Sequence, residues 1–79
     1  MKIKGTIHSD STGIFYIKSK GKKYRLHPDI FYVKMNMAIC DADGLIGMKA
    51  QGMLDAQFKP PEYFTYYDGI INSTTFELI

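Results

Sequence analysis

Apolar and polar residues alternate over short stretches in the first third of the chain. Residues 2–8 have a period of two, which predicts a strand with one face in water. A polar turn over residues 9–13 leads to the aromatic and β-branched run 14–17. Residues 20–22 contain the glycine of a tight hairpin turn, and residues 23–27 return as its second arm.

Pro28 interrupts this alternation. Because the fixed φ of proline suits the first position of a helix, we expect a short helical turn over residues 29–34. Alternation resumes over 35–39, which predicts another strand, and the Asp-Gly pair at 43–44 is typical of a hairpin turn. Residues 45–54 follow as a strand, with two glycines of the kind found at bulges and barrel corners.

A Lys-Pro-Pro-Glu break at 59–62 separates a second aromatic region from the rest of the chain. Residues 63–67 and 70–71 flank an Asp-Gly pair, which predicts a C-terminal β-hairpin. Residues 74–79 are either a last strand or a tail.

Many short strands with turns every 8–12 residues predict an all-β fold, a small five- to seven-stranded barrel with one helical turn. At 79 residues the chain is a single domain. We expect a barrel core over residues 1–58 and a C-terminal aromatic hairpin or extension over 62–79.

The rest of the composition indicates the cell compartment. Cys40 is the only cysteine, and we expect it to be a small buried residue of a strand rather than a nucleophile. One unpaired cysteine, no apolar leader and no long apolar run predict a cytoplasmic protein without a membrane segment.

The net charge of +2 hides an uneven distribution. Residues 1–40 carry eight basic and two acidic side chains, a balance of +6, whereas residues 41–79 carry two basic and six acidic ones, a balance of −4. This division predicts one basic face, as expected for a polyanion partner. The alternative is that the two parts neutralise each other across the fold.

The basic residues concentrate in the stretch YIKSKGKKYRLH, residues 16–27. We expect its cations to neutralise phosphates and its rings to stack on bases, so that the protein binds single-stranded RNA or DNA without catalysis. The alternative is a solvated hairpin whose lysines protect a strand edge and whose tyrosines are core. The candidate residues are Lys18, Lys20, Lys22, Lys23, Arg25, Tyr16, Tyr24 and His27.

Lys-Gly-Thr-Ile at 4–7 and Gly-Ile-Phe-Tyr-Ile at 13–17 resemble the first strands of cold-shock-like OB-fold domains. The likeness is greatest to the domains at the front of ribonuclease-II-type exonucleases. Tyr16 stands where that family has a stacking Phe, and His27 matches the His of its second nucleic-acid motif. The resemblance covers residues 3–56 and implies an OB-like barrel that meets its ligand at the second and third strands.

Four aromatic residues lie within five positions before the last Asp-Gly pair, so that both faces of a strand there carry rings. One face can be core, and the other then meets bases, a second copy or a protein partner. The alternative is that so small a domain uses both faces for one wrapped core. This gives an alternative function, a protein-interaction or inhibitor module of phage or mobile-element type that docks on a larger protein or dimerises. Its interface residues are Tyr63, Phe64, Tyr66 and Tyr67.

Catalysis and metal binding are not favoured. His8, Ser9 and Asp10 are consecutive, so they point in different directions and do not form a triad. The Asp-Ala-Asp-Gly stretch at 41–44 lacks the later ligands of a calcium loop, and two His with one Cys do not make a zinc site. We therefore expect a protein that is not an enzyme and has no cofactor.

Overall fold

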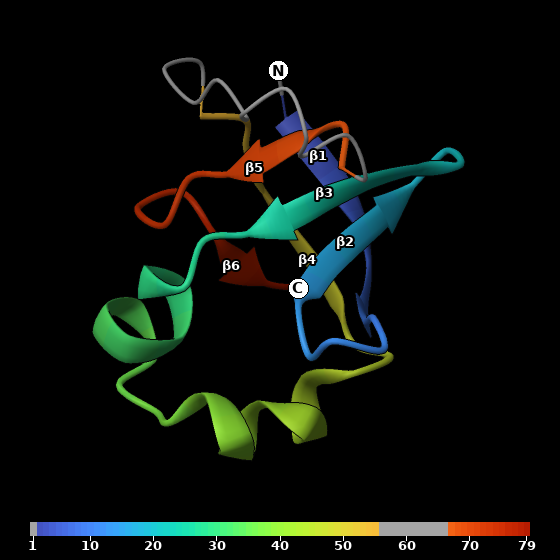
Figure 1. Cartoon of the computed structure of the whole chain (residues 1–79). Coiled ribbons are helices and arrows are strands. Elements are labelled where there is room, and N and C mark those ends of the chain that lie inside the picture. Colours follow the sequence, from blue (N-terminus) through green and yellow to red (C-terminus); the bar gives the residue numbers. More distant parts are fainter. Residues whose placement is uncertain (1, 56–66) are drawn as a thin grey trace.

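The computed structural model describes residues 2–55 and 67–79, which form one sheet and two short helical segments (Figure 1). The π-helical turn η1 (Ile30–Lys34) and the 3₁₀ helix η2 (Ile39–Leu45) lie together at one end of the sheet. The strands are β1 (Lys2–Ser9), β2 (Phe15–Ser19), β3 (Lys22–Leu26), β4 (Lys49–Met53), β5 (Gly69–Ile71) and β6 (Glu77–Leu78). Their order across the sheet is β5-β3-β2-β1-β4-β6.

The sheet curls until strands distant in its order meet. β5 pairs in parallel with β3. On its other side β5 contacts the residues that follow β4, where Leu54 and Ile71 form a bridge and the Asp55 amide donates to the Ile70 carbonyl oxygen at 2.9 Å. These contacts make the fold a small all-β barrel, as the sequence predicts.

The C-terminal residues complete this barrel. β6 pairs with β4, and the turn between β5 and β6 packs Phe76 into the core with 1% of its surface exposed. One continuous sheet thus contains strands from both expected parts, the core over 1–58 and the extension over 62–79. Gly69, expected in a hairpin turn, begins β5. Residues 63–66 of the expected hairpin lie outside the described residues.

The core consists of side chains that point inward at alternate strand positions, together with residues of the two helical segments. Phe31 of η1 packs against Phe15 of β2 with ring centroids 5.2 Å apart. η1 confirms the helical turn expected after Pro28. The core cluster comprises Ile3, Ile7, Phe15, Ile17, Tyr24, Leu26, Ile30, Phe31, Ala42, Leu45, Ala50, Ile71 and Phe76.

Local sequence accounts for the two turns of the β1–β2–β3 meander. At the β2–β3 turn, Lys20 and Gly21 have φ values of 52° and 79°, and such left-handed pairs match the twist of two-residue hairpins. The expected hairpin is confirmed. In the β1–β2 turn the Asp10 carboxylate accepts hydrogen bonds from the Thr12 amide at 2.8 Å and the Ile14 amide at 3.0 Å. One aspartate therefore stabilises the whole turn.

Residues 35–45 form neither the strand nor the Asp-Gly turn that their pattern predicts. Asn36, with φ of 50°, follows η1, and η2 then begins at residue 39. Ala42 and Leu45 are both buried, and their spacing of three residues fits the period of a 3₁₀ helix. Cys40 is exposed rather than buried, because this helix turns a different side toward the core.

Candidate functional site

A row of lysines crosses the outer face of the barrel. Lys18 on β2 lies opposite Lys23 on β3 and opposite Thr6 on β1, and Thr6 lies opposite Lys49 on β4. Side chains directly opposite on neighbouring strands have Cβ atoms about 5 Å apart, where like charges repel. We call Lys18, Lys23 and Lys49 the lysine row. Within residues 2–55 and 67–79, none of the three forms an ion pair with a carboxylate.

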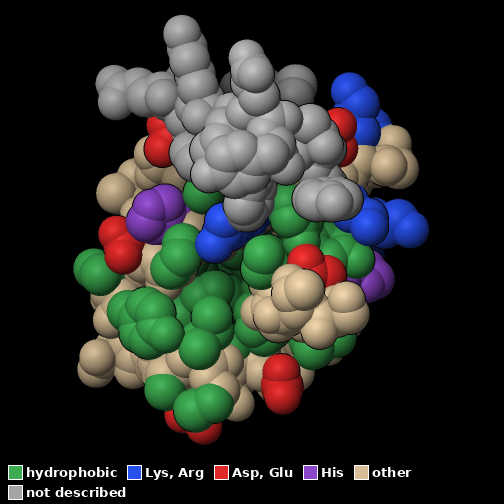
Figure 2. Space-filling view, viewed as in Figure 1, with side chains coloured by type: hydrophobic (Ala, Val, Ile, Leu, Met, Phe, Trp, Pro, Cys, Tyr) green, Lys and Arg blue, Asp and Glu red, His purple; other side chains and the backbone are tan. Residues whose placement is uncertain are grey.

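The tip of the β2–β3 hairpin extends this positive charge. Lys20 and Lys22 are exposed on either side of Gly21. Figure 2 shows Lys and Arg side chains projecting around this hairpin at the right of the view. In the described part of the chain these lysines form no ion pair, and the face carries positive charge over several neighbouring strands.

A cluster of rings, His8, Tyr16 and Tyr67, lies beside the lysine row and is called the aromatic cluster below. His8 on β1 is the register partner of Tyr16 on β2, and their rings stack with centroids 5.6 Å apart and planes 18° apart. The Tyr67 ring lies 5.8 Å from that of Tyr16. The Lys23 Nζ lies 5.2 Å from the Tyr16 ring centroid, a cation–π contact that joins the cluster to the lysine row.

Asp10 connects the β1–β2 turn to the aromatic cluster. The Tyr67 hydroxyl donates a hydrogen bond to the Asp10 carboxylate, which also accepts from the Thr12 hydroxyl at 2.7 Å. Burial by itself would raise the pKa of Asp10, but the hydrogen bonds from Tyr67, Thr12 and Ile14 outweigh it and hold that pKa far below the ordinary value. Burial and the adjacent carboxylate raise the pKa of Tyr67 well above its usual range.

The lowered pKa of Asp10 predicts an acid-dependent contribution to stability. The folded state binds fewer protons at Asp10 than the unfolded chain, whose carboxyl has the ordinary pKa of 3.8. The stabilisation is therefore complete above this value and is lost as the pH falls through the folded-state pKa. Asp10→Asn should lower the free energy of unfolding by about 1–2 kcal/mol near pH 7 and by clearly less near pH 2, as measured by urea denaturation.

Asp41→Asn is the matched control, because Asp41 is an exposed carboxylate of η2 and loses the same charge. We expect it to change the free energy of unfolding by less than about 0.5 kcal/mol at either pH. Equal destabilisation by Asp10→Asn at neutral and acid pH would contradict the role given to the Asp10 carboxylate.

The remaining candidate residues differ in where they lie. Tyr24, expected to stack on bases, lies in the core with 5% of its surface exposed, because it is an inward position of β3. The His27 Nδ1 accepts a hydrogen bond from the Asp29 amide at 3.0 Å, which ties His27 to the start of η1. Arg25, the register partner of Tyr16, borders the aromatic cluster. Tyr63, Phe64 and Tyr66 lie outside the described residues.

The lysine-rich hairpin predicts neither His8 nor Lys49 as part of the site. The period of two in residues 2–8 places His8 on the outer face, but only the strand pairing shows that it lies beside Tyr16. Lys49 joins the lysine row through pairing between β1 and β4, which are far apart in the sequence.

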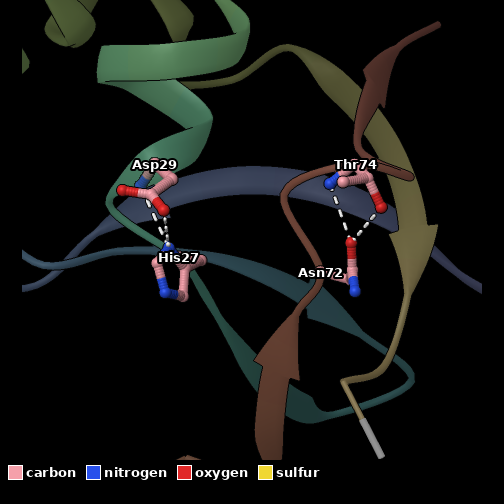
Figure 3. A network of polar contacts seen from close by, with 4 residues as sticks. All are labelled: His27, Asp29, Asn72 and Thr74. Carbon is pink, nitrogen blue, oxygen red and sulfur yellow. Dashed lines mark hydrogen bonds and ion pairs between the residues drawn. The ribbon is translucent and has the colours of Figure 1, made fainter.

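An open pocket of about 330 Å³ lies between η1 and the β5–β6 turn. Figure 3 shows two nearby polar pairs, in which His27 contacts Asp29 and Asn72 contacts Thr74. The Lys34 Nζ donates to the Thr74 carbonyl oxygen at 2.8 Å, so this lysine is already engaged. The described ranges contain no group of three or more His, Cys, Asp and Glu side chains placed to hold a metal ion.

Comparison with protein-family models, with curated proteins and with solved structures finds no match for this chain. Among the described residues, none of the helices has the length and apolar character to cross a membrane.

Proposed function

We propose that this protein binds single-stranded nucleic acid, without catalysis, through the outer face of β1, β2 and β3. The observation that carries the proposal is the lysine row beside the aromatic cluster. Lys18 and Lys23 are register partners, and neither forms an ion pair with a carboxylate in the described part of the chain, so an anion bound beside them would relieve their mutual repulsion. The phosphates of a nucleic acid supply such anions.

The rings beside the row favour a single strand over a duplex. Bases that are not paired can stack on aromatic side chains, and each such contact contributes about 1–3 kcal/mol. His8, Tyr16 and Tyr67 lie within one cluster, and the Lys23 Nζ is 5.2 Å from its central ring. Phosphates and bases of one strand thus have neighbouring places on the same face.

The connectivity of the barrel supports the same proposal. β1 lies between β2 and β4, and β5 returns beside β3, an arrangement compatible with the five-stranded Greek-key barrel of OB folds. Such folds bind oligonucleotides on the face of strands 2 and 3, between the loops that follow strands 1 and 4. Here Asp10 of the β1–β2 turn and Tyr67 of the β4–β5 connection meet over that face.

The test is binding of a fluorescein-labelled oligothymidylate of about 15 nucleotides, followed by anisotropy at several salt concentrations. Neutralisation of three to five phosphates predicts a log–log slope of about −2 to −3.5. A duplex of the same length should bind at least about tenfold more weakly, because its bases cannot stack on the cluster. Absence of binding at low salt, or a slope near zero, would refute the proposal.

A further inference from the structure

The central ring of the aromatic cluster is covered in the free protein. Tyr16 is only 9% exposed, although it points outward from the barrel. His8, Lys23 and Tyr67 all lie within 6 Å of its ring centre, at 5.6, 5.2 and 5.8 Å. A base that stacks on a tyrosine needs an open ring face. One of these neighbours must therefore move before a base can stack on Tyr16.

Tyr67 is the neighbour that can move at the smallest structural cost. His8 and Lys23 belong to β1 and β3, the strands that pair with β2, so their positions beside Tyr16 follow from the sheet register. Tyr67 instead precedes β5, and β3 separates β5 from β2 in the sheet. Its side chain reaches over β3 to contact Tyr16, and its departure breaks no pairing among β1, β2 and β3.

Within residues 2–55 and 67–79, Tyr67 is attached through its anchored neighbour Asp68 and through one side-chain hydrogen bond. The next residue is anchored on β3, where the Asp68 amide donates to the Lys23 carbonyl oxygen at 2.7 Å and the Asp68 carboxylate accepts from the Lys23 amide at 2.9 Å. The Tyr67 ring itself is held by its contact with Tyr16 and by the hydrogen bond from its hydroxyl to Asp10. Among the described residues, rotation of the Tyr67 side chain therefore uncovers the side of the Tyr16 ring that Tyr67 contacts.

We infer that Tyr67 occupies the place of a base on Tyr16, and that a nucleic-acid strand binds by displacing Tyr67 and releasing it from Asp10. This inference rests on the proposed function. The apparent dissociation constant of such a site equals the intrinsic constant divided by the fraction of open protein. Every contact that holds Tyr67 in place therefore weakens binding, and its removal strengthens binding.

The test compares oligothymidylate binding by the wild-type protein, Tyr67→Ala and Tyr67→Phe. Tyr67→Ala should bind about tenfold more tightly, because no displacement is needed. Tyr67→Phe keeps the ring and loses only the hydrogen bond to Asp10, so it should bind about threefold more tightly. The salt slope should be unchanged in both variants, since the lysine row is intact.

Tyr32→Ala is the matched control, because Tyr32 lies on η1 and is 53% exposed. It should leave the affinity unchanged. Circular dichroism melting curves establish that each variant is folded at the assay temperature. A ligand-free readout is the NMR signal of the Tyr16 ring protons, which should shift in Tyr67→Ala as the neighbouring ring disappears.

The outcomes separate this inference from the proposed function. Weaker or unchanged binding by Tyr67→Ala overturns the inference, and weaker binding makes Tyr67 part of the stacking surface, while the proposed function stands. Tighter binding by Tyr67→Ala than by the wild type, with an unchanged salt slope, supports the inference. If neither protein binds in a salt-dependent manner, the proposed function fails and the inference fails with it.

Discussion

Lys18→Glu combined with Lys23→Glu should weaken binding of the oligothymidylate about 100-fold at about 50 mM salt. Each reversal removes an attraction to phosphate and adds a repulsion, and one such pair at about 4 Å in water is worth about 1 kcal/mol. After screening, a total of about 2.7 kcal/mol corresponds to the 100-fold loss. The log–log salt slope should also become shallower by about 1.4, the value for two phosphate contacts on a single strand.

The control for this prediction is Lys2→Glu combined with Lys34→Glu, which changes the net charge equally. Lys2 lies at the far end of β1 and Lys34 on η1, so neither belongs to the lysine row. We expect less than a threefold to fourfold change in affinity, about 0.8 kcal/mol, from the altered net charge alone. Equal losses in the two double variants would show that the protein attracts nucleic acid only through its overall charge.

Stability of the double variant should remain close to that of the wild type. Replacing Lys18 and Lys23 by glutamates keeps two like charges opposite each other in the register. The cation–π contact of Lys23 with Tyr16 is lost, at a cost of about 0.5–1 kcal/mol. Urea denaturation of both double variants separates a binding defect from unfolding.

Gly5→Ala should destabilise the fold by about 3 kcal/mol or more, the upper range for overpacking a close contact. β1 pairs with β4 over Lys2–Thr6 and with β2 over Thr6–Ser9, so Gly5 lies where the strand passes from one partner to the other. A Cβ atom at this position would collide with the backbone carbonyl oxygen of Lys18 and approach the Ile17 Cγ2 to 2.8 Å. The backbone of β2 cannot withdraw without disturbing the core.

This loss is a large part of the stability of so short a chain, for which about 4–12 kcal/mol is ordinary. The midpoint of urea denaturation should fall accordingly, with an unchanged slope. Gly44→Ala is the control, because Gly44 lies in η2 and nothing lies within 4 Å of the added Cβ. It should be neutral or slightly stabilising. Similar destabilisation by both substitutions would contradict a steric role for Gly5.

Much of the barrel could be predicted from local patterns. The glycine at the β2–β3 turn supplies the left-handed conformation that a two-residue hairpin needs, and the alternation around it places Leu26 inside. The strand predicted from the alternation over residues 35–39, which includes two methionines, was wrong. Met35 and Met37 do pack against the core, but they do so from an irregular connection into η2. Period alone cannot separate a short strand from such a segment.

The candidate site could be predicted only in part. The hairpin sequence identified Lys18, Lys20, Lys22 and Lys23 as cations beside one turn, and their exposure agrees with that expectation. It could not separate the two tyrosines of the hairpin, because the apolar run 14–17 around Tyr16 shows no period of two. Tyr24 lies in the core, whereas Tyr16 points outward. Which face of β2 and β3 is turned inward depends on how the whole sheet curls.

The sequence by itself determined the all-β class, the β2–β3 hairpin and the concentration of lysines near it, since these depend on residues close together in the chain. Only the tertiary structure decided which side chains share the outer face. The lysine row needs Lys49 from β4, and the aromatic cluster needs His8 from β1 and Tyr67 from before β5. The physical reason is that strand register and barrel closure depend on the burial of the whole core. The sequence of a single strand therefore does not show which other strands will lie beside it.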